Sequence, residues 1–154
     1  MKLMKMLLSA LLIFAVCGCT KNDVKDGVEK TVAITLKIED AMNHKELFTG
    51  TVSATGIELT LADVLSANAD ALQLVSEDTA YGMQINGLMG VETTDWAKGP
   101  WWGYTSENNE SCVQAGYCTG ASELKVADGD EFSFTFSQGY YDIRVLFFRT
   151  LFMC

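Results

Sequence analysis

The chain has 154 residues, of which 49% are hydrophobic and 20% charged, as expected for one globular domain. Its 8 Phe, 5 Tyr and 3 Trp argue against intrinsic disorder, because disordered chains contain few aromatic residues. The net charge of −9 argues against a protein that binds nucleic acid through its phosphates. One His and one Pro exclude a His-rich metal site and a Pro-rich linker.

The N-terminus has the composition of an export signal. Lys2 and Lys5 precede an apolar run over residues 7–16, which is shorter than the about 20 residues that span a bilayer. One alternative is an ordinary signal peptide that is cleaved after Ala15.

A more specific pattern follows the apolar run. Residues 16–19, Val-Cys-Gly-Cys, resemble a bacterial lipobox, in which a small residue precedes the Cys that receives the lipid. Cys17 fits less well because the bulky Val16 precedes it. We therefore expect residues 1–18 to be a lipoprotein signal peptide and Cys19 to be lipidated.

Removal of this signal leaves 9 basic and 20 acidic residues, a net charge of −11. Anionic lipid would repel such a surface, whereas the acyl chains each contribute about 0.8 kcal/mol per buried CH₂. The sequence therefore predicts an extracytoplasmic protein that is anchored to the bacterial membrane through Cys19.

Residues 19–30 are expected to form the lipidated Cys and a flexible tether, since they are polar and lack apolar periodicity. A charged cap on a surface helix is the alternative, but Gly27 and the short length argue against it. The domain is expected over residues 31–138, and an apolar tail over residues 139–154.

The domain begins with a predicted hairpin. Its first strand shows period-two alternation, with apolar residues at positions 32, 34, 36 and 38. A second strand is expected over residues 46–53, after the polar segment 39–45.

Thr60 is expected to cap the one clear helix, with Asp63 three residues later in its first turn. The apolar face of this helix contains residues at helical spacing, namely Leu61, Val64, Leu65 and Leu72.

Short strands are expected after the helix. They cover residues 81–85, with Asn86-Gly87 as a turn signal, and residues 101–105. The turn Asp128-Gly129-Asp130 precedes a strand with alternating Phe132, Phe134 and Phe136. The order of hairpin, helix and further strands predicts an α+β fold in which one helix covers one sheet face.

The sequence contains no catalytic motif that we recognise. There is no GxSxG elbow, P-loop or GxGxxG, and His44 is the only imidazole, so HExxH and zinc triads are excluded. Residues 128–130 lack the further oxygen ligands of a calcium loop. We expect neither an enzyme nor a metal site nor a cofactor.

Two cysteines are candidates for a disulfide. Between Cys112 and Cys118, five residues including Gly116 can reverse a hairpin and bring the two Cα atoms within bridging distance. Outside the cytoplasm such a pair usually oxidises. The alternative is two buried thiols on facing strands. Cys154 has no assigned partner and is expected to be a free thiol or a site of attachment for another chain.

The three Trp lie within seven residues. Strand alternation directs Trp101 to one face of a strand, and Trp102 and Tyr104 to the other. One of the two adjacent Trp is expected in the core, and the other is free, with Trp96, to face a ligand or partner. In the alternative interpretation all three pack in a small β core.

Three short sequence motifs, in this order, resemble those of a known family. They are Ile85-Asn86-Gly87, then Trp101-Trp102-Gly103-Tyr104, then residues 124–132. They are similar to those of the transcobalamin-like C-terminal domain family, which groups bacterial surface proteins with the β-domain of cobalamin carriers. The similarity covers residues 32–137 and implies a β-grasp-like fold, with a mixed sheet of about five to seven short strands and one covering helix.

The resemblance implies a ligand-binding module for a corrinoid or another bulky amphipathic small molecule, bound as ligand and not as cofactor. In the carriers a helical barrel forms the second wall of the site, and we expect no room for it in this chain. The implied ligand surface consists of Trp96, Trp101, Trp102 and Tyr104, with Tyr117 nearby.

The alternative function is a non-enzymatic adhesion or interaction module, in which the same aromatic residues contact a protein or glycan. A surface protein or transporter is then the candidate partner. Nucleic acid is not expected as a partner of either module.

The tail of residues 139–154 is strongly apolar but contains Arg144 and Arg149, and it is too short for a membrane span. We expect a final strand against Phe132–Phe136; a strand that found no such place would be an exposed, adhesive edge.

Overall fold

A computed structural model describes residues 27–139. The expected signal peptide, Cys19, most of the tether, the tail after Gly139 and Cys154 lie outside the described residues. The domain opens with a long antiparallel hairpin, β1 (Lys30–Asp40) and β2 (Lys45–Gly56). Residues 34, 36 and 38 of β1 are fully buried, so the predicted alternation is confirmed.

The predicted helix is confirmed but is broken once. It consists of α1 (Leu61–Ala67) and α2 (Ala69–Leu72), and a capping box between Thr60 and Asp63 opens it. The break lies at Asn68, whose Nδ2 donates to the carbonyl oxygens of Val64 and Ser53. This side chain ties the end of α1 to β2.

A second sheet contains β3 (Val75–Thr79), β4 (Gly82–Leu88) and β5 (Val91–Glu92) in that order. The turn expected at Asn86-Gly87 is wrong, because both residues lie inside β4. The chain reverses instead at Met89-Gly90, where both φ angles are positive. Gly87 is needed for close approach: a Cβ there would lie 2.6 Å from Cγ of Glu92. The exposed strand β3 lacks alternation and was not predicted.

The chain then forms β6 (Trp101–Thr105), α3 (Glu110–Ala115) and β7 (Glu131–Ser137). The main sheet has the order β2-β1-β7-β6, in which β1 and β7 are parallel and the other pairs antiparallel. This is the β-grasp arrangement, and the predicted α+β class is confirmed. Within residues 27–139, seven strands form two sheets instead of one, and three short helices replace the single covering helix.

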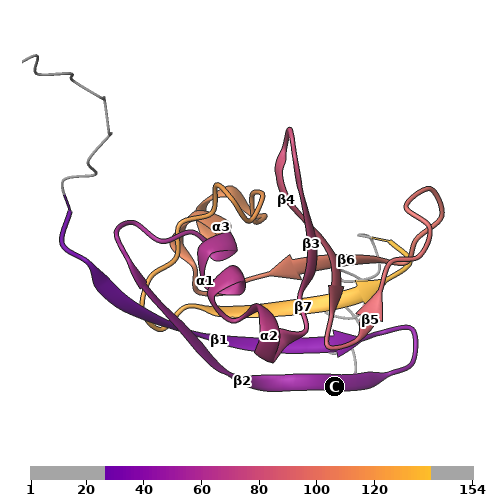
Figure 1. Ribbon diagram of the computed structural model, residues 1–154. Helices are drawn as coiled ribbons and strands as arrows, with labels where there is room; N and C mark the ends of the chain where they lie inside the picture. The colour runs from indigo at the N-terminus through magenta and orange to yellow at the C-terminus, as the bar shows by residue number, and fades with distance from the viewer. Residues whose placement is uncertain (1–26, 140–154) are drawn as a thin grey trace, which may run out of the picture.

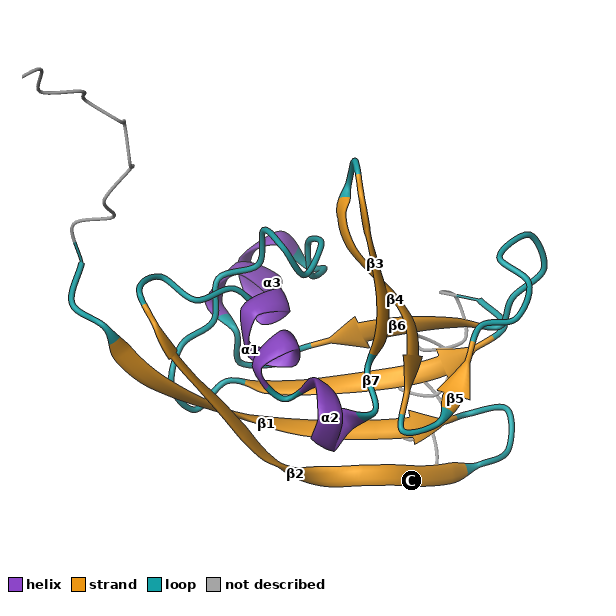
Figure 2. Ribbon diagram, in the orientation of Figure 1, coloured by secondary structure: helices purple, strands orange, loops and turns teal. Residues whose placement is uncertain are grey.

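One face of the main sheet carries the core. In Figures 1 and 2 the helices and the second sheet lie on the same side of this sheet. Fully buried side chains from β1 and β7 meet those of the helices and β4 there; they include Ile34, Leu36, Ile38, Phe132, Phe134, Leu61, Val64, Leu65, Leu72 and Leu88. On the opposite face of the main sheet, Thr135 and Ser137 of β7 are also buried.

Strand β7 lies inside the main sheet. Both hydrogen-bonding edges of β7 are occupied, by β1 along Glu131–Phe136 and by β6 along Ser133–Ser137. The final strand that the sequence predicts in the tail lies after Gly139, outside the described residues, and stays a prediction.

Candidate functional site

The segment of residues 93–101, which we call the aromatic turn, joins the second sheet to β6. Backbone groups of Lys98 and Gly99 donate to the carbonyl oxygen of Asp95, and the Ala97 amide donates to the Asp95 carboxylate at 2.9 Å. Gln138, just after β7, donates to the Lys98 carbonyl oxygen at 2.6 Å. Hydrogen bonds within the turn and from Gln138 therefore brace this segment.

Trp101 and Trp96 lie together on the aromatic turn. The Trp101 Nε1 donates to the carbonyl oxygen of Trp96 at 3.1 Å. The Trp101 ring also lies directly against Gly99, where an added Cβ would be 2.7 Å from the ring and φ is +72°. Only Gly allows both this contact and this backbone conformation without strain. Trp101 is half-buried, and 44% of Trp96 is exposed.

Trp102 and Tyr104 point to the core side of the sheet, as strand alternation requires. The Trp102 ring lies 5.1 Å from that of Phe136, and its Nε1 donates to the Val91 carbonyl oxygen. The Tyr104 ring lies 5.1 Å from that of Phe134. Trp102 is thus the adjacent Trp that packs in the core, and Trp101 is the one that does not.

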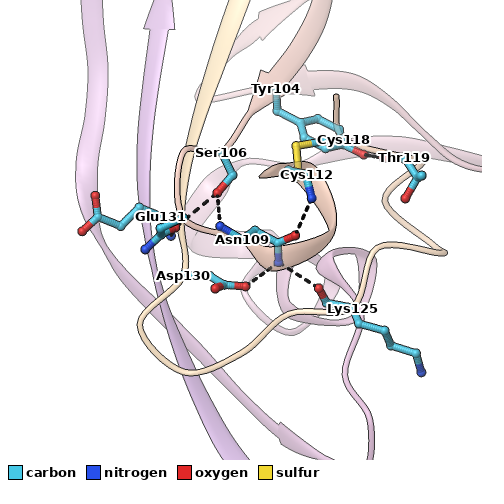
Figure 3. Close-up of a disulfide and its surroundings, with 10 residues drawn as sticks. Tyr104, Ser106, Asn109, Cys112, Cys118, Thr119, Lys125, Asp130 and Glu131 are labelled. Carbon is cyan, nitrogen blue, oxygen red and sulfur yellow. Dashed lines mark hydrogen bonds between the residues drawn. A yellow bond between two sulfur atoms is a disulfide. The ribbon is translucent and has the colours of Figure 1, made fainter. Parts of the chain in front are cut away.

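The Tyr104 hydroxyl donates to the Thr119 carbonyl oxygen at 2.6 Å, and thereby joins β6 to the disulfide loop (Figure 3). The disulfide Cys112–Cys118 is confirmed, with Cα atoms 4.4 Å apart. The expected hairpin around it is wrong, because residues 110–115 form α3 and the chain turns at Gly116, with φ +76°. Asn109 before this segment and Gly116 after it are preferred helix-capping residues, so the signal was present in the sequence.

Asn109 holds α3 against the domain (Figure 3). Its side-chain oxygen accepts from the Cys112 amide, and its Nδ2 donates to the Asp130 carboxylate at 2.6 Å and to the Lys125 carbonyl oxygen at 3.0 Å. Asp130 also accepts from the Ala127 amide. Asn109 and Asp130 are both buried, so this network has a structural role. The turn of residues 128–130 is likewise structural, as the sequence predicted.

The five predicted ligand residues therefore do not form one site. Trp96 and Trp101 lie together at the start of β6, whereas Trp102 and Tyr104 face inward. Tyr117 is 60% exposed but follows α3, at the opposite end of β6. The candidate site is thus the aromatic turn, and Tyr117 belongs to another part of the surface.

A groove that sequence reasoning missed lies at the other end of the main sheet. It has a volume of about 510 Å³ and runs between the start of β1, the end of β2 and residues 126–128. Apolar side chains line it, among them Val28, Val32, Ile57 and Val126, with Lys30, Glu58 and Asp128 around them. It contains none of the predicted ligand residues.

Across residues 27–139 there is no group of three or more His, Cys, Asp or Glu side chains that could hold a metal ion. None of the helices in the described part of the chain has the length and apolar character that crossing a membrane demands.

Comparison with known proteins shows the fold. No family model matches the chain, and no curated protein does. Among solved structures, the chain is similar to a protein from Ruminococcus gnavus ATCC 29149 described as a "putative metal binding protein", with a TM-score of 0.51 and 24% identity. The match covers 71% of this chain and 99% of that one.

The chain is also similar to haptocorrin, a cobalamin carrier, in complex with Cbi. The TM-score is 0.53 at 12% identity, over 72% of this chain. The match spans only 26% of the haptocorrin chain. At these identities the comparisons establish a shared fold, which agrees with the resemblance found in the sequence.

Proposed function

We propose that this protein is a bacterial surface lipoprotein of the transcobalamin-like family, whose aromatic turn binds a bulky amphipathic ligand, with a corrinoid as the first candidate. The observation that carries the proposal is that the Trp101 indole bonds to the Trp96 backbone carbonyl oxygen, on a turn that further hydrogen bonds brace. Large aromatic surfaces that are fixed before binding lose little conformational entropy when a ligand arrives.

The haptocorrin fold supports the choice of ligand class, since that structure contains Cbi. The site described here differs from an enclosed one, because the aromatic turn offers a single exposed surface. A ligand on one surface loses much of the contact area that a closed site provides, so we expect weak affinity.

The test is titration of cyanocobalamin and cobinamide into the purified full chain in detergent, followed by calorimetry and by Trp fluorescence. We expect saturable heat at sub-millimolar ligand, and Trp96→Ala should weaken binding about tenfold, equivalent to about 1.4 kcal/mol. Tyr117→Ala is the matched control, because Tyr117 is also an exposed aromatic residue but lies away from the aromatic turn.

Absence of saturable heat with both corrinoids would overturn the corrinoid assignment. Equal weakening by Trp96→Ala and Tyr117→Ala would instead overturn the aromatic turn as the site.

A further inference from the structure

Two exposed tyrosines lie at the end of the domain that carries the disulfide. Tyr81 lies in the turn between β3 and β4 and is 94% exposed, and Tyr117 lies in the disulfide loop. In Figure 1 the β3–β4 hairpin projects from the domain on the same side of the main sheet as α3. Val113, next to Cys112 in the disulfide loop, is exposed as well. We call Tyr81, Val113 and Tyr117 the tyrosine surface.

The segment that follows the disulfide packs against the tip of this hairpin. The Met83 amide, at the start of β4, donates to the Ser122 hydroxyl at 2.9 Å. A Cβ added to Gly120 would lie 3.8 Å from the carbonyl oxygen of Tyr81. Gly120 comes only three residues after Tyr117, so the hairpin tip and the disulfide loop form one part of the surface.

The backbone that carries the tyrosine surface is fixed on both sides. Val113 and Tyr117 are each adjacent to a Cys of the disulfide. At the hairpin tip, the Tyr81 amide donates to the Thr79 hydroxyl at 3.1 Å, and this hydroxyl donates to the Gly82 carbonyl oxygen at 2.9 Å. A backbone that is fixed in advance loses little entropy on binding, and a Tyr side chain has few rotamers to lose.

The charged side chains around the tyrosine surface are all acidic. Residues 75–82 and 106–124 contain no Lys or Arg, and their acidic residues are all exposed, namely Glu77, Asp78, Glu107, Glu110 and Glu123. The next cation along the chain, Lys125, is paired with Glu58 at 3.2 Å. Such a surface attracts a cationic partner, and it repels anionic lipid and a second copy of itself.

We propose that the tyrosine surface binds a protein partner through a basic segment that also carries apolar side chains. Tyr is enriched where proteins bind one another, because its ring supplies apolar contact area and its hydroxyl a hydrogen bond. Apolar side chains of the partner cover the two rings and Val113, and its Lys or Arg side chains meet the surrounding acids. The disulfide loop lies at the opposite end of β6 from the aromatic turn, so this inference goes beyond the proposed function.

The experiment is selection of random dodecapeptides, displayed on phage, against the full chain immobilised in mild detergent. We expect the enriched peptides to combine a net positive charge with aromatic or aliphatic residues. A synthetic copy of the most enriched peptide should bind about tenfold more weakly to the double variant Tyr81→Ser and Tyr117→Ser. Met42→Ser is the matched control, because Met42 is an exposed apolar residue in the turn between β1 and β2, and it should leave binding unchanged.

A second pair of variants tests the charges. Glu77→Gln combined with Glu110→Gln should weaken binding of the same peptide and make it less sensitive to NaCl, because two of the attracting acids are gone. Glu29→Gln combined with Glu46→Gln is the control, since it removes the same charge from exposed positions outside residues 75–82 and 106–124.

Four results would overturn the proposal: no enriched peptide, enriched peptides that are neutral or acidic, unchanged binding to the tyrosine double variant, or equal effects of the two pairs of charge variants. Circular dichroism checks that each variant folds. Corrinoid titration separates the two proposals, because the tyrosine double variant should leave corrinoid binding unchanged, whereas Trp96→Ala should weaken corrinoid binding and leave peptide binding unchanged.

Discussion

The Asn109 Nδ2 lies 2.6 Å from a carboxylate oxygen of Asp130, and both residues are buried although 21 positions separate them in the chain. This hydrogen bond joins the N-terminus of α3 to the residue that precedes β7. It therefore ties the start of the disulfide loop to the start of β7, one of the two central strands of the main sheet.

Replacement of Asn109 by Ala should destabilise the domain by about 1–3 kcal/mol, because it leaves the Lys125 carbonyl oxygen without this donor and Asp130 with one bond fewer. Urea unfolding followed by circular dichroism measures the change. Gln114→Ala, on the exposed side of the same helix, should change stability by less than about 0.5 kcal/mol. Equal effects of the two variants would show that the buried network contributes nothing specific.

The disulfide should stabilise the domain through the short loop that it closes. The double variant Cys112→Ala and Cys118→Ala is expected to lose about 2 kcal/mol, since a cross-link of this length removes a modest amount of chain entropy from the unfolded state. Reduction of the wild-type protein should lower its stability by a similar amount, and the double variant should not respond to reductant. A wild-type protein that is equally stable with and without reductant would contradict this prediction.

Replacement of a packed Trp and of an exposed Trp should lower the stability of the domain by different amounts. Trp102→Ala is expected to cost about 2–3 kcal/mol, because the ring packs on Phe136 and its Nε1 bonds to Val91. Trp96→Ala should cost less than about 0.5 kcal/mol, because this side chain lies at the surface. Chemical unfolding of both variants measures the two losses in unfolding free energy. A larger loss for Trp96→Ala than for Trp102→Ala would contradict this prediction.

Lipidation is expected at Cys19 and not at Cys17. Cys19→Ser should abolish incorporation of labelled fatty acid and move the protein from the membrane fraction to the soluble fraction, because the acyl chains supply the anchoring free energy. Cys17→Ser is the matched control, two residues away, and should leave labelling unchanged. Labelling that survives Cys19→Ser would refute the lipobox interpretation.

The sequence predicted the elements whose pattern is local. Alternation of Phe132, Phe134 and Phe136 predicts a strand with one buried face, because successive side chains point to opposite sides of a sheet. Thr60 and Asp63 predict the helix start for a similar reason, since a capping box forms within four consecutive residues. The pairing of Cys112 with Cys118 is equally local, although the helix between them was missed.

The prediction of a turn at Asn86-Gly87 was wrong because Gly has two structural roles that a sequence alone does not distinguish. It permits positive φ in a turn, and it also allows close approach of a neighbouring chain. Here the neighbours are Val75 and Glu92, which crowd Gly87 from both sides. Their positions depend on the pairing of β4 with β3 and β5.

By itself the sequence determined the period-two strands, the capped helix and the concentration of Trp within one segment. It also determined that Trp101 and Trp102 face opposite ways, because a strand leaves adjacent residues no other choice. Which of the two faces the core was decided only by the tertiary structure, since β6 pairs with β7 and turns Trp102 toward Phe136.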